Sequence, residues 1–141
     1  FNKAAQSFNY GYKWTVEKED YVINELSKSY YKGLTILGGE PFEPENQPEI
    51  KKLILRVRKE LPEKDIWIYT GNKYEDLLPD GAKHIPDCTD IILDNIDILV
   101  DGPFIIAKKN IRLKFRGSEN QRIIDIKSTR VSGKVILHPL N

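Results

Sequence analysis

Short apolar runs alternate with amphipathic segments along most of the chain. The apolar runs within residues 33–37, 65–72 and 96–104 are typical of strands buried in a parallel sheet. Apolar residues at helical spacing predict a helix from residue 47 to Leu61, with Asn46 and Glu49 as a capping box before it. A weaker apolar stripe predicts a helix over residues 16–29, with Thr15 as its N-cap.

Each of the three predicted strands ends at a glycine turn. The turns are Gly38-Gly39-Glu40-Pro41, Thr70-Gly71-Asn72 and Asp101-Gly102-Pro103. Alternation of strands with helices predicts an α/β fold with a mainly parallel sheet and right-handed crossovers. Ligands of such sheets bind beyond the carboxyl ends of the strands, so the three turns are expected on one ligand-binding rim.

The two ends of the chain are less regular. Residues 111–115 and 122–128 are predicted as strands on either side of the segment Arg116 to Gln121, and residues 134–141 as a further strand. Near the start, aromatic residues occupy every second position, which predicts an extended segment with one aromatic face: Phe8, Tyr10, Tyr12 and Trp14. That face either packs in the core, the favoured interpretation, or lies over the rim or towards a partner protein.

Composition indicates an ordinary soluble globular protein. The chain has 141 residues, of which 40% are hydrophobic and 30% charged, which fits one domain. It contains no apolar run of membrane-spanning length and no signal-peptide pattern, so we expect a cytoplasmic protein that binds no membrane. A net charge of +1 provides no overall field for binding nucleic acid.

The cysteine and methionine content limits the metal sites that the chain can form and bears on where the chain begins. Cys88 is the single cysteine, and with only His84 and His138 beside it the sequence contains no metal ligand set of the usual size. We expect Cys88 to be a small buried apolar residue. Because the chain lacks methionine and begins at Phe1, we expect it to be a fragment without its natural start.

The first glycine turn has two possible meanings. Gly-Gly-Glu-Pro can be an ordinary tight turn that ends a strand, since glycine and proline favour tight turns. Alternatively, the glycines let a ligand approach the backbone while Glu40 accepts hydrogen bonds from an ammonium group, which would suit a zwitterionic ligand. The turn lacks the spacing of the usual phosphate-binding loops.

Four segments in order resemble a known family: LTILGGEPFEPEN, KDIWIYTG, DILVDGPF and LKFRGSENQRIID. They are similar to the activating proteins of anaerobic ribonucleoside-triphosphate reductases, which are small members of the radical S-adenosylmethionine (SAM) family. The resemblance implies a small partial (βα) barrel of the radical SAM type, formed by residues 1–141 as a single domain. It also implies a 4Fe-4S cluster, whose Cys-x3-Cys-x2-Cys ligands would lie upstream of Phe1 and are absent from this chain.

The resemblance also implies contacts with S-adenosylmethionine. Gly38, Gly39 and Glu40 match the loop that contacts its amino end, and Thr70 and Asp101 match polar positions that reach its ribose or carboxylate. The full set of implied cofactor-binding residues is Phe1, Asn2, Gly38, Gly39, Glu40, Thr70 and Asp101. No side chain is implied as a catalytic acid, base or metal ligand, and the role of Arg116 to Gln121 stays open between partner docking and turn stabilisation.

The implied activity is that of a glycyl-radical-generating enzyme. Reductive cleavage of S-adenosylmethionine would yield a 5′-deoxyadenosyl radical, which abstracts hydrogen from a glycine of the large reductase subunit, with a reductant such as flavodoxin supplying the electron. This fragment alone is expected to be inactive. Two alternatives remain open: an activating enzyme for another glycyl-radical enzyme, such as pyruvate formate-lyase, and a non-catalytic protein-binding module.

Overall fold

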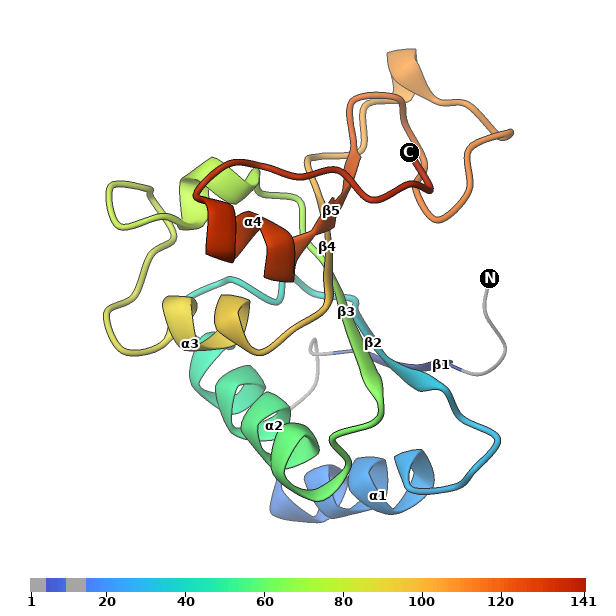
Figure 1. Cartoon of the computed structure of the whole chain (residues 1–141), viewed down its shortest axis with the longest axis vertical. Helices are drawn as coiled ribbons and strands as arrows, with labels where there is room; N and C mark the ends of the chain where they lie inside the picture. Colours follow the sequence, from blue (N-terminus) through green and yellow to red (C-terminus); the bar gives the residue numbers. More distant parts are fainter. Residues whose placement is uncertain (1–4, 10–14) are drawn as a thin grey trace.

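A single mixed sheet organises the protein (Figure 1). The computed structural model describes the backbone of residues 5–9 and all of residues 15–141. The five strands lie in chain order across the sheet: β1 (Ala5–Asn9), β2 (Gly33–Leu37), β3 (Asp65–Tyr69), β4 (Ile98–Asp101) and β5 (Arg122–Asp125). The first four are parallel and β5 is antiparallel to β4. The predicted α/β fold with a mainly parallel sheet is therefore confirmed.

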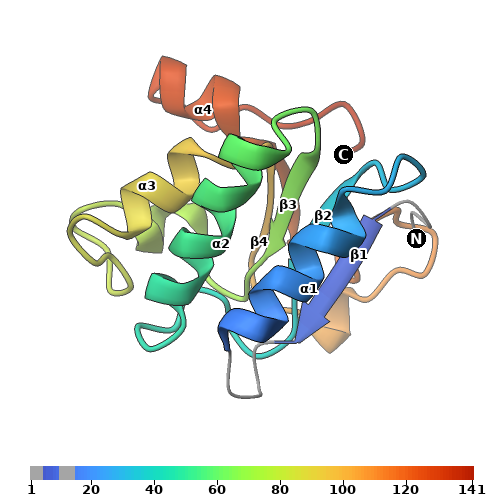
Figure 2. The same ribbon diagram turned by 90° about the horizontal axis from the view of Figure 1, so that it is seen from below.

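The longer helices connect the parallel strands and lie against one face of the sheet (Figures 1 and 2). The α-helices are α1 (Val16–Leu26), α2 (Gln47–Glu60), α3 (Thr89–Asp94) and α4 (Ile126–Ser132), and the 3₁₀ helices are η1 (Tyr74–Leu77) and η2 (Ile106–Lys108). No helix among the described residues is both long and apolar enough to cross a membrane.

The main core lies between these helices and the sheet. Strand residues that face the helices are aliphatic and fully buried, and they include Leu34, Ile36, Ile66, Ile68 and Leu99. Helix α2 contributes a stripe of buried aliphatic side chains at the predicted helical spacing: Ile50, Leu53, Ile54 and Val57. Burial of these apolar surfaces, at about 25 cal/mol per Å², is the main force that holds the helices on the sheet.

A smaller apolar cluster occupies the other face of the sheet. Ile98, Val100 and Ile123 are buried there, and Trp67 packs against Phe115 with ring centroids 5.3 Å apart. Phe115 belongs to the long connection between β4 and β5, so this connection folds back over the second face. The Tyr69 hydroxyl fixes it there by donating a hydrogen bond of 2.6 Å to the carbonyl oxygen of Phe115.

Several local predictions are confirmed and others are wrong. The Thr15 hydroxyl caps α1 by accepting from the Lys18 amide at 3.2 Å, as predicted. The capping box at Asn46 is wrong, because the Asn46 side chain instead donates from Nδ2 to the carbonyl oxygen of Glu40 at 2.8 Å.

The predicted strand at residues 111–115 is also wrong: turns and bends occupy these positions, and Ile111 is 88% exposed, so its apolar side chain has no sheet to cover. Residues 122–125 do form a strand, but residues 126–128 begin helix α4. Near the C-terminus, the predicted strand is reduced to one isolated bridge between Ile124 and Leu137.

The predicted aromatic face falls mostly outside the described residues. Tyr10, Tyr12 and Trp14 lie outside them, and for Phe8 only the backbone, in β1, is described. The predicted extended segment is confirmed at Phe8 and Asn9, where it overlaps β1, and the role of the aromatic side chains stays a prediction.

Candidate functional site

The carboxyl ends of β2, β3 and β4 meet at one open cavity of about 280 Å³, which we call the rim cavity. This is the edge of a parallel sheet at which ligands bind. Its walls come from the three glycine turns and from the segment that precedes β5. They consist of Leu37, Gly38, Gly39, Glu40, Tyr69, Thr70, Gly71, Gly102, Phe104 and Gln121. The sequence prediction that the turns share one rim is confirmed.

The turn after β2 needs both of its glycines. Gly38 and Gly39 have φ angles of 71° and 44°, a left-handed region that favours glycine over residues with a Cβ. Both glycines are exposed, while Pro41 and Phe42 behind them are buried. The chain thus presents bare backbone to the rim cavity and anchors that backbone in the core immediately afterwards.

Glu40 joins the turns after β2 and β3. Its Oε2 accepts hydrogen bonds from the Phe42 amide (2.8 Å) and the Thr70 hydroxyl (2.7 Å), and its Oε1 accepts one from the Gly71 amide (2.7 Å). Thr70 is 5% exposed, and its hydroxyl also accepts from the Asn72 amide at 3.1 Å. The carboxylate is therefore a clasp that sets the distance between two turns.

The same carboxylate keeps capacity for a ligand. A carboxylate has about four acceptor sites, and the described residues fill three of them. Among the described residues Oε1 accepts from Gly71 alone, and Glu40 lines the rim cavity. It can accept one further hydrogen bond, which makes Glu40 chemically suited to an ammonium group as well as to the clasp.

Asp101 differs from the other predicted contacts. It is 1% exposed, and its Oδ2 accepts from the Tyr74 amide at 2.7 Å while Arg122 Nε donates to Oδ1 at 3.0 Å. Arg122 also donates to Glu75, and this hydrogen bond lowers the pKa of the Glu75 carboxyl. Asp101 lines a separate neighbouring cavity rather than the rim cavity. Its predicted contact with S-adenosylmethionine stays a prediction.

The segment Arg116 to Gln121 forms a tight turn that Gln121 holds together. Gln121 Oε1 accepts from the Gly117 and Ser118 amides at 2.8 and 3.0 Å, and its Nε2 donates to the carbonyl oxygen of Gly102 at 3.1 Å. Ser118 Oγ accepts from the Ile105 amide at 3.2 Å. These contacts favour turn stabilisation for the segment. Sequence analysis missed Gln121 as a wall of the cavity, because its partner Gly102 lies 19 residues away.

Two of the predicted cofactor contacts cannot be placed: Phe1 and Asn2 lie outside the described residues. Gly38, Gly39, Glu40 and Thr70 are brought together as walls of the rim cavity. Sequence analysis also missed Phe104 and Tyr69, which line this cavity beside them.

The residues present do not fit an iron–sulfur cluster. Cluster ligation needs several thiolates, and Cys88 is the single cysteine of the sequence. Cys88 is 6% exposed in the core, as predicted, and burial raises the pKa of its thiol. No group of three or more His, Cys, Asp or Glu side chains within residues 15–141 is placed to hold a metal ion. A cluster on this chain would need thiolates that the 141 residues do not contain.

The chain matches one family model and several relatives that share a single protein name. A family model described as "4Fe-4S single cluster domain" matches residues 1–124. The anaerobic ribonucleoside-triphosphate reductase-activating protein of Escherichia coli (strain K12) is 39% identical over 123 residues, which cover 86% of this chain and 75% of that protein. Its namesake from Enterobacteria phage T4 is 36% identical over 125 residues (87% and 72%), and that from Vibrio cholerae is 37% identical over 125 residues (87% and 76%). No solved structure matches the chain.

Proposed function

The chain belongs to the family of anaerobic ribonucleoside-triphosphate reductase-activating proteins, and from this premise we propose that it generates the glycyl radical of such a reductase. The reductase is the macromolecular substrate, and S-adenosylmethionine is the small-molecule cofactor. The observation that carries the proposal is the rim cavity, because the segments that resemble the family supply its walls at the carboxyl ends of three parallel strands.

The chemistry of the bound cofactor is reductive cleavage of its sulfonium, which leads to a glycyl radical on the reductase. The chain's own residues bind the cofactor and orient it. Gly38 and Gly39 present bare backbone, and Glu40 would hold the amino group of the cofactor by accepting a hydrogen bond at Oε1, which now accepts from Gly71. A carboxylate–ammonium hydrogen bond is worth about 1.5–3 kcal/mol, enough to fix which end of the cofactor enters.

No acid or base from the described residues is needed for this role. The protein positions a reactive cofactor and admits a glycine of its partner, which is the usual division of labour in cofactor enzymes. We further propose that the five-stranded sheet represents the partial barrel of the radical SAM type, and that a reductant such as flavodoxin supplies the electron.

Electron paramagnetic resonance tests this function on the protein reconstituted anaerobically with a 4Fe-4S cluster whose thiolates are supplied from outside these 141 residues. Incubation with the large reductase subunit, S-adenosylmethionine and a reductant should produce a glycyl radical signal on the reductase. The signal should vanish when S-adenosylmethionine is omitted. A radical on pyruvate formate-lyase and none on the reductase would overturn the proposal in favour of a different glycyl-radical partner.

A calorimetric titration with S-adenosylmethionine tests the role of Glu40. Glu40→Ala should weaken binding by about tenfold to a hundredfold, which corresponds to the loss of one charge-assisted hydrogen bond. Glu40→Asp should weaken it less, because the charge remains and one methylene of reach is lost. Equal affinities of wild type, Glu40→Ala and Glu40→Asp would mean that Gly-Gly-Glu-Pro is a structural turn and that Glu40 does not bind the cofactor.

A further inference from the structure

The connection between β4 and β5 has a charge unlike that of the rest of the chain. We call its residues 104–118 the 104–118 loop. The loop contains five of the 22 Lys and Arg residues and none of the 21 Asp and Glu residues. The rest of the chain therefore has 17 cations against 21 acids, a net charge of −4. A local cationic patch thus stands on a protein that is otherwise acidic.

Most of these cations are unpaired within the described part of the chain. Hydrogen bonds and ion pairs engage many other Lys and Arg side chains, such as Arg56, which contacts Asp20 at 2.6 Å. Within residues 15–141, no such contact is found for the exposed side chains of Lys108, Lys109, Arg112 and Lys114. Their charge is available to an approaching anion.

The loop also exposes large apolar side chains. Phe104, Ile106 and Ile111 are 53%, 72% and 88% exposed. A single exposed isoleucine is ordinary, but three large apolar side chains within eight residues are typical of an interaction surface. The loop extends beyond the sheet, on the side away from α1 to α3 (Figure 1).

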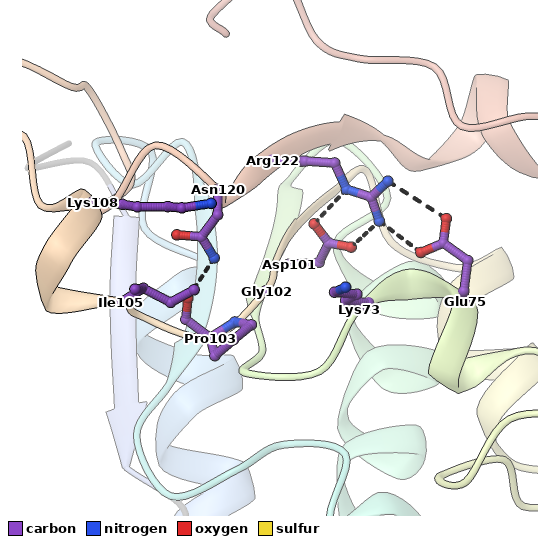
Figure 3. A pocket seen from close by; sticks show the side chains of 9 residues that line it. All are labelled: Lys73, Glu75, Asp101, Gly102, Pro103, Ile105, Lys108, Asn120 and Arg122. Carbon is purple, nitrogen blue, oxygen red and sulfur yellow. Dashed lines mark hydrogen bonds and ion pairs between the residues drawn. The ribbon is translucent and has the colours of Figure 1, made fainter.

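A second cavity, of about 660 Å³, lies beside the loop (Figure 3). Arg122 is committed to Asp101 and Glu75 there. Lys108 enters the cavity from the 104–118 loop, and Lys73 enters from the segment before η1. Neither ammonium group has an ion pair among the described residues, so an anionic group that enters the cavity would meet both of them. The Glu75 carboxylate lies in the same lining, and its pKa is lowered by Arg122 and, to a smaller extent, by Lys73.

The 104–118 loop borders the rim cavity. Phe104 at the start of the loop lines the rim cavity, and Gly102 lines both cavities. A polypeptide that inserts a segment into the rim cavity would therefore contact the 104–118 loop. Docking and chemistry would share one edge of the sheet.

We propose that the 104–118 loop and the cavity beside it form the docking surface for the large reductase subunit. They accept an acidic patch that also carries exposed apolar side chains, with one carboxylate of the patch in the cavity between Lys73 and Lys108. The inference rests on the proposed function, which supplies the partner. The exposed apolar side chains favour a protein over a polyanion.

Biolayer interferometry with immobilised reductase subunit tests this surface. The double variant Lys108→Glu/Lys109→Glu should bind the reductase at least about tenfold more weakly, since like charges now face each other. The matched control Lys52→Glu/Lys59→Glu makes the same change in net charge on the exposed face of α2 and should bind like wild type. Ile106→Ser/Ile111→Ser should also weaken binding, but with the salt dependence of wild type.

Two further measurements complete the test: the salt dependence of reductase binding, and binding of anionic vesicles and single-stranded DNA. Wild-type binding should weaken between about 50 and about 200 mM salt, and Lys108→Glu/Lys109→Glu should show a smaller change. Equal binding by all variants would overturn the docking surface and leave the proposed function intact. Absence of reductase binding by the wild type would overturn both. Binding of anionic vesicles or single-stranded DNA that depends on Lys108 and Lys109, with reductase binding unaffected, would also overturn the inference.

Discussion

The turn after β2 and the 104–118 loop after β4 leave the same edge of the sheet but are built in opposite ways. The first is short, has two glycines in left-handed conformations, and is clasped to the turn after β3 by Glu40. The second is long, and the cations and apolar side chains of its outer part are exposed. Its backbone is held across the loop by an isolated bridge between Lys109 and Ser118 and by a hydrogen bond of 2.9 Å from the Glu119 amide to the carbonyl oxygen of Lys108. Its base is fixed through Phe115 and the contacts of Gln121.

The difference separates two kinds of recognition. A small ligand is bound best by groups that are in place before it arrives, because ordering them on binding would cost affinity. A protein partner can instead be attracted by exposed surface charges, which raise the rate of encounter. The clasped turn fits the first task and the outer part of the loop fits the second.

The largest expected effect comes from breaking the clasp. Glu40→Ala removes the acceptor of three donors, one of which is the buried Thr70 hydroxyl, and should lower the free energy of unfolding by about 2–4 kcal/mol. Glu43→Ala is the matched control in the same loop, because it removes only a partly exposed ion pair with Lys83 and should cost less than about 1 kcal/mol. Urea denaturation measures both, and equal losses would contradict the clasp.

Substitutions of Gln121 test whether its hydrogen bonds fix the base of the 104–118 loop. Gln121→Leu keeps the shape but removes two accepted hydrogen bonds and one donated bond, and should cost about 1–3 kcal/mol. Gln121→Glu retains both acceptor contacts and should recover part of that loss. Thermal unfolding should therefore rank wild type above Gln121→Glu and Gln121→Leu last. The reverse order of the two variants would show that the hydrogen bonds accepted from Gly117 and Ser118 do not hold the turn.

Gly117→Ala tests whether the loop shapes the rim cavity. A Cβ at Gly117 would lie 2.9 Å from the Phe104 ring, and because this ring is half exposed it can move aside at a cost below about 1 kcal/mol. Radical formation on the reductase should fall several-fold even so, since Phe104 is displaced from the rim cavity.

Gly133→Ala is the control for this variant. Its φ of 77° penalises a side chain by about 1 kcal/mol, at a helix end that lines neither cavity. It should lower stability at least as much and leave radical formation unchanged. Equal activity of the two alanine variants would contradict a role for Phe104 in the rim cavity.

Local pattern predicted the interior of the fold but not the contacts between its turns. Strand and helix positions followed from residues that are buried together within one element, such as Ile50 and Leu53 in α2. The strand predicted at residues 111–115 failed because alternation of apolar and charged residues describes an exposed basic loop equally well. Glu40 was predicted as a site residue, but its clasp was not, since its partners Thr70 and Gly71 lie 30 and 31 residues away.

The smallest expected effect concerns Tyr69, which anchors the loop at Phe115. Burial raises the pKa of the Tyr69 hydroxyl to about 12, above its ordinary value near 10. The neutral form is favoured in the folded state, so this stabilisation is complete below about pH 10 and is lost as the pH rises towards 12.

Tyr69→Phe lacks both the titration and the hydrogen bond to Phe115, and should cost about 0.5–1.5 kcal/mol at pH 7. Denaturation midpoints of the two proteins should therefore converge between about pH 10 and 12, while other alkaline effects act on both alike. Parallel curves across this range would mean that the hydroxyl is not held in the folded protein as described. The base of the 104–118 loop would then lack its anchor to β3, and the contrast with the clasped turn would extend to the whole loop.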